Sequence, residues 1–184
     1  NFLQGEPLNE ESPMNPISPY GAAKLVGHNL VKMYRKAYSI HAVSGILFNH
    51  ESPLRGLDFV TRKITNTIAK IKLGLCKNLT LGNINARRDW GYAPEYMEAV
   101  YLMMQQDEPD DYVIAVNESH SVQEFVGQAA DAAGIGVRIK TDKKYSSPLD
   151  INELRGDYSW AEDNFGWVPK TKFRNLVKIM VTED

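Results

Sequence analysis

Apolar residues recur along the chain at the spacings of helices and strands. Between residues 60 and 73 they fall every three or four positions, which predicts an amphipathic helix that ends near Gly74. The same periodicity predicts further helices at residues 19–38, 94–106, 121–134, 158–164 and 172–181. Shorter apolar runs predict strands at residues 40–48, 79–81, 112–116 and 137–140. Helices that alternate with short buried strands indicate an α/β fold with some parallel pairing.

Residues at several helix ends support these boundaries. Ser18 can cap the first helix because its hydroxyl can accept a hydrogen bond from a free backbone N–H, and Pro19 suits the first turn. Ser121 and Glu124 match a capping box. We expect Thr171 to cap the last helix.

The packing of two helices can also be predicted. In helix 19–38, apolar residues cover more than half of the circumference, so we expect one face to pack on the sheet and another on a second copy of the chain. In helix 94–106 we expect five side chains to face inward: Tyr96, Met97, Val100, Met103 and Met104.

Composition limits the partners of the protein. Hydrophobic residues make up 43% and charged residues 24% of the sequence, and the net charge is −2 with both signs interspersed. This balance is typical of a globular protein, and we expect no nucleic-acid partner and no membrane association. Cys76 is the single cysteine, which excludes an intrachain disulfide and a cysteine-built zinc site. We therefore expect a reducing, cytoplasmic setting and no bound metal, and interpret Cys76 as a packing residue.

Tyr20 and Lys24 form the sharpest chemical feature of the sequence. Residues four apart on a helix lie on the same face, one turn apart. A lysine beside a phenol favours the phenolate, so Tyr20 is a candidate general base. The spacing is common on amphipathic helices, however, and taken by itself it favours an exposed lysine beside a packed tyrosine without a catalytic role.

The motifs around this pair resemble those of a known family. Residues 18–24, Ser-Pro-Tyr-Gly-Ala-Ala-Lys, resemble the active-site helix of extended short-chain dehydrogenases. Residues 48–53, Phe-Asn-His-Glu-Ser-Pro, with Arg55 after them, are similar to a segment of the GDP-mannose 4,6-dehydratases. The resemblance covers essentially the whole chain, because it continues in family order at residues 81–83, 88–91 and 106–112.

This resemblance implies roles for individual residues. Tyr20 would be the catalytic base, and Lys24 would hold the nicotinamide ribose of NADP and promote ionisation of Tyr20. His50 and Arg55 would also contact NADP. The nucleotide-sugar site would contain five residues, of which the two cations suit a pyrophosphate: Asn49, Lys63, Gly82, Asn83 and Arg88.

Simpler interpretations exist for single residues. His50 could merely end a strand, Arg88 could pair with Asp89, and Lys63 could be a solvated helix charge. Trp90 is interpreted as a core residue rather than a substrate contact. The agreement of several motifs in order and spacing is the reason for favouring the site.

The resemblance also implies an architecture and a reaction. Residues 1–50, with 92–117 returning to them, would form the C-terminal part of a Rossmann-like domain, and residues 51–91 and 118–184 mainly a nucleotide-sugar-binding lobe. The reaction would convert GDP-mannose to GDP-4-keto-6-deoxymannose through transient oxidation at C4 by NADP. The alternatives are another epimerase, reductase or dehydratase of nucleotide sugars, and a non-catalytic module that binds the nucleotide sugar or dimerises through its first helix.

The sequence departs from the family at several positions. Leu54 and Ser147 stand where the family has arginines, and Ser147 cannot replace a bidentate cation, which leaves the identity of the sugar nucleotide open. The sequence contains no Gly-x-x-Gly-x-x-Gly turn for the dinucleotide phosphates. In the family, a catalytic Thr or Ser and a Glu precede the segment that begins here at Asn1. We therefore expect a fragment of a longer enzyme, inactive by itself.

Overall fold

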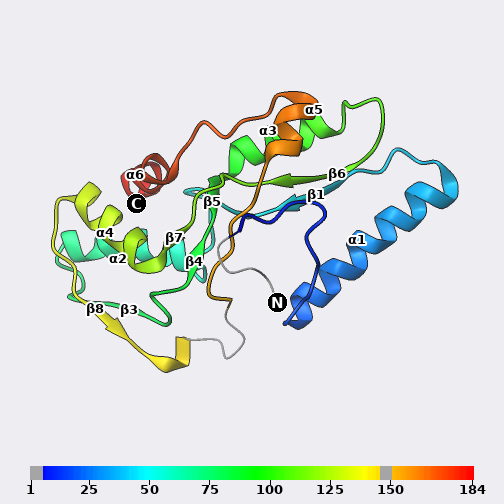
Figure 1. The fold of residues 1–184 in the computed structure, drawn as a ribbon. Helices are drawn as coiled ribbons and strands as arrows, with labels where there is room; N and C mark the ends of the chain where they lie inside the picture. The colour runs from blue at the N-terminus through cyan, green and yellow to red at the C-terminus, as the bar shows by residue number, and fades with distance from the viewer. Residues whose placement is uncertain (1–5, 146–150) are drawn as a thin grey trace.

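The computed structural model describes residues 6–145 and 151–184, which form an α/β fold as predicted (Figure 1). Its α-helices are α1 (Pro19–Tyr38), α2 (Val60–Lys72), α3 (Ala93–Met103), α4 (Val122–Ala133), α5 (Ser159–Phe165) and α6 (Phe173–Glu183), and a 3-10 helix, η1, spans Lys143–Tyr145. Its strands are β1 (Ser44–Leu47), β2 (Asn49–Glu51), β3 (Leu79–Leu81), β4 (Arg87–Arg88), β5 (Trp90–Tyr92), β6 (Asp111–Ile114), β7 (His120–Ser121) and β8 (Ile139–Thr141).

Within the described residues, the strands pair as four two-stranded ladders. The ladders β1–β6, β2–β5 and β3–β8 are parallel, and β4–β7 is antiparallel. Parallel neighbours need long crossover connections, and here each parallel pair is separated in sequence by at least one helix. The parallel pairing expected from the sequence is therefore confirmed.

The chain changes its partner strand at Phe48. Phe48 still hydrogen-bonds to the end of β6, and the next three residues form β2 against β5. The strand expected at residues 40–48 is found over Ser44–Leu47, and Asn49 and His50, expected after its end, lie in a second short strand that the sequence pattern did not indicate. The apolar run marks only the first ladder, since β2 is built from polar residues of which Glu51 alone is fully buried.

Helices α2, α4 and α6 enclose a hydrophobic cluster that we call the α2–α4–α6 cluster. Trp90 enters it from β5, edge-on to Phe125 at 5.3 Å between ring centres and stacked on Phe173 at 6.0 Å. This confirms Trp90 as a core residue. Burial of each large side chain contributes about 1.5–3 kcal/mol. The other large members are Ile64, Ile68, Leu79, Leu81, Val122, Val126, Leu176, Val177 and Met180.

A second cluster, the α3–β6 cluster, joins α3 and α5 to β6. Its buried members are Tyr96, Ala99, Met103, Tyr112, Ile114, Val116, Ala161 and Trp167. Met97 and Met104 were expected to face inward with them, but both are about half exposed. Both methionines face solvent because the buried residues of α3, Tyr96, Ala99 and Met103, form a narrow stripe spaced by three and four residues.

Helix α1 lies along one side of the molecule, beside β1 (Figure 1). None of its residues is fully buried. One stripe is partly covered, at Gly21, Leu25, His28, Val31 and Arg35. Apolar side chains elsewhere on the helix are exposed, namely Val26, Leu30, Met33, Tyr34 and Tyr38. Among the described residues, one face of α1 is therefore covered in part and the other is open, so the packing of the second face on another copy of the chain stays a prediction.

The helix caps agree with the sequence at one end and differ at another. The capping box of Ser121 and Glu124 is present in both of its hydrogen bonds. Thr171, in contrast, does not cap α6, whose N-cap is Lys172. The Thr171 hydroxyl donates instead to the Glu95 carboxylate at 2.5 Å, which ties the start of α6 to α3.

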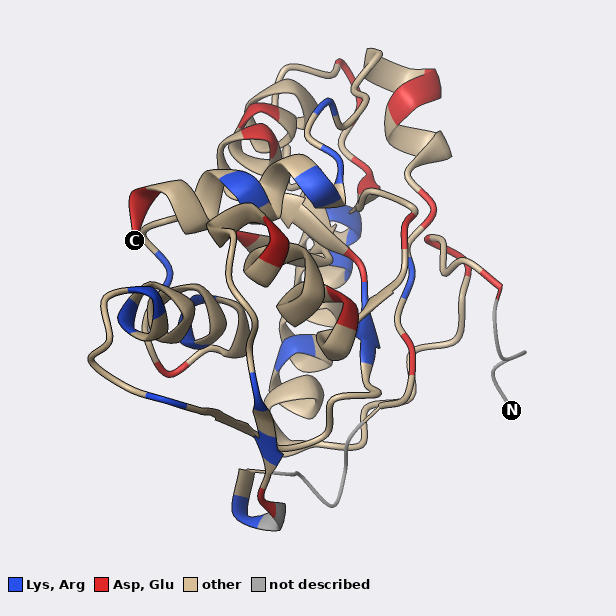
Figure 2. Cartoon of the chain, turned by 90° about the vertical axis from the view of Figure 1, so that its left-hand side faces the viewer, with Lys and Arg blue, Asp and Glu red and all other residues tan. Residues whose placement is uncertain are grey.

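Basic and acidic residues are interspersed over the described elements (Figure 2). Among these residues there is no helix long and apolar enough to cross a membrane, and no group of three or more side chains suited to hold a metal ion. Cys76 is half-buried, and its sulfur lies 3.8 Å from the Thr67 carbonyl oxygen.

Candidate active site

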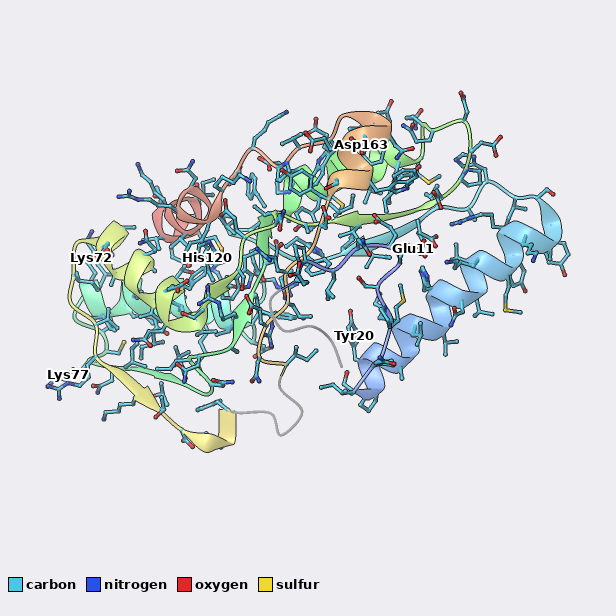
Figure 3. The ribbon with its side chains drawn as sticks, viewed as in Figure 1. Glu11, Tyr20, Lys72, Lys77, His120 and Asp163 are labelled. Carbon is cyan, nitrogen blue, oxygen red and sulfur yellow. The ribbon has the colours of Figure 1, made fainter. Side chains whose placement is uncertain are left out.

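The first two turns of α1 carry Tyr20 and Lys24. Ser18 Oγ accepts a hydrogen bond from the Gly21 N–H at 3.0 Å, so the helix begins at Pro19 as its cap predicts. Lys24 Nζ lies 5.8 Å from the centre of the Tyr20 ring. Tyr20 is 73% exposed at the end of the helix, so a ligand can reach it (Figure 3). The helix thus presents a phenol and an ammonium group together on an accessible face.

The strand β2 holds Asn49 and His50 at the junction of two ladders. His50 Nδ1 lies 2.9 Å from the Phe48 carbonyl oxygen. Because a carbonyl oxygen only accepts, Nδ1 carries a proton, and in the neutral ring Nε2 is an acceptor. The ring also packs against Tyr96, with 5.2 Å between the ring centres. These two contacts fix the direction in which His50 presents Nε2.

Glu51 connects β2 to the start of α2, a role that the sequence did not reveal. Its buried carboxylate accepts a hydrogen bond from Thr61 Oγ1 at 2.7 Å. The carboxylate also lies 3.3 Å from Arg55 Nε, where it forms an ion pair but not an aligned hydrogen bond. Burial raises the pKa of Glu51, although Thr61 and Arg55 act in the opposite direction. The Arg55 guanidinium carbon sits 3.5 Å from the centre of the Phe59 ring. Arg55 is therefore held between a carboxylate and an aromatic face.

Lys63 has a specific aromatic partner. In the first turn of α2, Lys63 Nζ lies 3.8 Å from the centre of the Tyr145 ring, and the lysine is half-buried. Asp142 N donates to Leu81 O at 2.8 Å, so η1 begins at the end of β3, beside Gly82. This contact distinguishes Lys63 from a freely solvated helix charge. Sequence reasoning missed Tyr145, because nothing in the local pattern pairs it with a residue on a distant helix.

Asn83 and Arg88 follow β3 in the chain. Asn83 Oδ1 accepts a hydrogen bond from the Asn85 N–H at 3.0 Å, which closes a compact turn. Arg88 lies in β4, and its NH1 donates to the carbonyl oxygens of Arg87 and Ile151, both at 2.7 Å. Ser147, where the family has an arginine, lies outside the described residues.

Asp89 anchors the segment that bears Arg88. Its fully buried carboxylate accepts three backbone hydrogen bonds, from Val116 and Asn117 at 2.9 Å and from Gly156 at 3.2 Å. Burial raises the pKa of Asp89 to about 6, although these N–H groups oppose the shift. The carboxylate therefore fixes the end of β6 and the segment at Gly156 against the strand that presents Arg88.

The predicted residues fall into three groups. The first is the exposed pair Tyr20 and Lys24 on α1. The second surrounds β2 and contains Asn49, His50 and Arg55. The third surrounds the end of β3 and contains Lys63, Gly82, Asn83 and Arg88. Among the described residues, the contacts above join Tyr20 to Lys24 directly, whereas the members of the other two groups contact neighbouring residues such as Glu51, Tyr145 and Ile151. None of these contacts links the α1 pair to the other two groups.

Solved structures with the same fold define the class of protein. The structure of RMD from Pseudomonas aeruginosa complexed with NADPH superposes with a TM-score of 0.87 at 22% identity, covering 96% of this chain and 59% of that one. The dTDP-glucose 4,6-dehydratase from Bacillus anthracis in complex with NAD gives 0.84 at 20% identity, covering 98% and 56%. The fold is therefore that of part of the nicotinamide-binding nucleotide-sugar enzymes.

Sequence comparison identifies the family. The sequence pattern of GDP-mannose 4,6 dehydratase matches residues 3–180, so the chain belongs to that family, as its motifs indicated. GDP-mannose 4,6 dehydratase 1 of Arabidopsis thaliana is 49% identical over 180 residues, which is 97% of this chain and 50% of that protein. The Homo sapiens relative is 44% identical over 201 residues, 99% of this chain and 54% of its own length. The chain thus spans about half the length of the curated relatives it matches.

Proposed function

We propose that this chain carries part of the active site of a GDP-mannose 4,6-dehydratase, which converts GDP-mannose to GDP-4-keto-6-deoxymannose. The observation that carries the proposal is the capped N-terminal end of α1, where Tyr20 and Lys24 lie on one accessible face in a chain of this family. The Tyr20 phenolate accepts the proton of the C4 hydroxyl group, and the Lys24 charge stabilises that phenolate.

The residues assigned to NADP fit such a cofactor. Lys24 is exposed and can donate to a ribose hydroxyl, His50 presents Nε2 in a fixed direction, and Arg55 is held in place by Glu51 and Phe59. Bound NADP supplies reversible hydride transfer. The protein holds the reacting carbon near Tyr20 and controls the proton of its hydroxyl group.

The nucleotide end of the substrate is assigned to the group around the end of β3. Lys63 and Arg88 provide positive charge for the two phosphates, and Asn49 provides an amide for the sugar. Gly82 and Asn83 provide backbone groups close to the guanine base of the nucleotide. The support for this assignment is that Gly82 and Asn83 follow β3, while Lys63 contacts Tyr145 of η1, which follows β8, the strand paired with β3.

Two further proposals concern architecture. We assign residues 1–50 and 92–117 to the dinucleotide domain and residues 51–91 and 118–184 mainly to the nucleotide-sugar lobe. The α3–β6 and α2–α4–α6 clusters support this division, except that α5 packs with the first group. We also propose a homo-oligomer formed through α1, whose exposed apolar side chains support a second copy as partner.

A joined enzyme tests the proposed function. Residues 1–184 are placed behind the part of the Arabidopsis relative that this chain does not cover. With GDP-mannose and NADP, we expect a keto product whose mass is lower by one water, measured by mass spectrometry. A folded joined enzyme that leaves GDP-mannose unchanged would refute the proposal. Turnover of UDP-glucose or dTDP-glucose instead would identify a related enzyme with a different sugar nucleotide.

A further inference from the structure

Two lysines approach the ring of Tyr145. Lys63 Nζ lies 3.8 Å from the ring centre and Lys144 Nζ lies 4.8 Å from it. Tyr145 itself is 50% exposed. The ring therefore has close contact with a cation that belongs to the distant helix α2, and it remains accessible from solvent.

The position of Lys63 explains why such a partner is needed. The N-terminus of a helix disfavours a cation by about 0.3–1 kcal/mol, and the first turn of α2 contains no acidic residue and no side-chain cap. Arg62, the neighbouring cation, pairs with Asp184. A carboxylate beside Lys63 would neutralise its charge, whereas an aromatic face attracts the ammonium group and leaves its charge available to an anion.

The position of Tyr145 in the fold relates the Lys63 charge to the proposed nucleotide-sugar site. Asp142 bonds to the end of β3, so Tyr145 lies close to the turn at Gly82 and Asn83. We propose that Tyr145 is a positioning residue that holds Lys63 ready for the diphosphate of the sugar nucleotide. This inference rests on the proposed function and deepens it, since it names the part of the substrate that the pair recognises.

Calorimetry of GDP and guanosine binding to the 184-residue chain tests this inference. Tyr145→Leu should weaken GDP binding about two- to fivefold, the size of one exposed cation–π contact, and leave guanosine binding unchanged. Tyr145→Phe keeps the aromatic face and should bind GDP as the original chain does. Tyr101→Leu removes another exposed tyrosine, on α3, and should have no effect.

A double-mutant cycle separates positioning from a general structural role. After Lys63→Met, the further change Tyr145→Leu should cost nothing more in GDP affinity, because the ring acts through Lys63. Additive losses, equal effects on guanosine, or no GDP binding by the original chain would each overturn the inference. If the Tyr145 dependence holds but the joined enzyme fails to dehydrate GDP-mannose, the proposed function is refuted and this inference becomes one about a GDP-binding site.

Discussion

Burial and hydrogen bonding act in opposite directions on Asp89. Removal of the carboxylate from water favours its protonated form, while the three backbone N–H groups favour the charged form. Burial has the larger effect, and the pKa lies near 6 instead of 3.8. The folded protein therefore binds a proton at Asp89 over a pH range in which the unfolded chain has released it.

This difference gives a pH dependence with a definite sign. Stability from Asp89 should be fully present below about pH 4 and lost as the pH rises through 6, a change of about 3 kcal/mol at 1.4 kcal/mol per pKa unit. Asp89→Asn removes the titration. Urea unfolding of both proteins between pH 4 and 7 should show the stability of the original falling relative to the variant. A relative rise would mean that the N–H groups outweigh burial.

Tyr20 is tested by substitutions in the joined enzyme. Tyr20→Phe keeps the ring but removes the proton acceptor, so kcat should fall by about 10² to 10⁴. Lys24→Ala should reduce both kcat and NADP affinity. Arg88→Ala should raise KM for the nucleotide sugar and leave NADP affinity near normal. Full activity of Tyr20→Phe in steady-state assays would show that the Tyr20–Lys24 spacing is accidental.

At the scale of elements, the sequence predicts what depends on local chemistry. The start of α1 at Ser18 and the capping box at Ser121 are correct because each cap is decided within four residues. The ladders β2–β5 and β4–β7 could not be predicted, since each of their strands has only two or three residues, too few to show a periodicity. Thr171 is a cap by residue type, but a distant carboxylate on α3 competes successfully for its hydroxyl.

The attachment of α1 depends on Asp111 at the start of β6. Its buried carboxylate lies 2.7 Å from Arg35 NH2 and 3.1 Å from Lys32 Nζ, both on α1. Burial alone would raise the pKa of Asp111, but the hydrogen bonds from Arg35 and Lys32 outweigh it and the pKa is lowered. This group therefore stabilises the fold above its unfolded pKa, and the contribution is lost as the pH falls through the folded value.

Asp111→Asn should therefore loosen α1. We expect the free energy of unfolding to fall by about 1.5–3 kcal/mol at neutral pH, as for hydrogen bonds to charged groups. Amide exchange should also become faster than in the original chain, and more so along α1 than along α4. Hydrogen–deuterium exchange measures the second effect. Asp107→Asn, at an exposed position before the same strand, is the control and should change neither quantity. Unchanged exchange in α1 would mean that other contacts hold the helix.

At the scale of the whole molecule, the motifs propose the members of the site but not its geometry. Positions such as His50 and Arg88 are candidates because family motifs keep their order along the chain. The contacts of Lys63 with Tyr145 and of Arg88 with Ile151 were out of reach, since each joins segments that only tertiary packing brings together. For the same reason the role of Glu51 was not predicted: it belongs to the motif at residues 48–53, and in the fold its carboxylate forms an ion pair with Arg55.

The open face of α1 gives a prediction about assembly. Light scattering over a range of concentrations should show a dimer or larger oligomer, because the proposed contact with a second copy would bury the exposed apolar side chains of α1. Leu30→Glu, in the middle of that face, should shift the population to monomer. Tyr101→Glu, an exposed apolar position on α3, should not. A chain that is monomeric at all concentrations would contradict the proposed role of α1.

The crossing at Gly156 has a consequence for the order of folding. A side-chain carbon on Gly156 would lie 2.4 Å from the Ala115 side chain and 2.8 Å from the Phe48 ring, closer than atoms can approach. The backbone at Gly156 therefore packs directly against the side chains of Ala115 and Phe48. The hydrogen bond from Gly156 to Asp89 closes a loop of 67 residues. During synthesis the α3 and β6 segments leave the ribosome long before Gly156 does. This contact is therefore among the last that can form during synthesis, and until it does the segment at Gly156 is not yet tied to Asp89, next to the strand that carries Arg88.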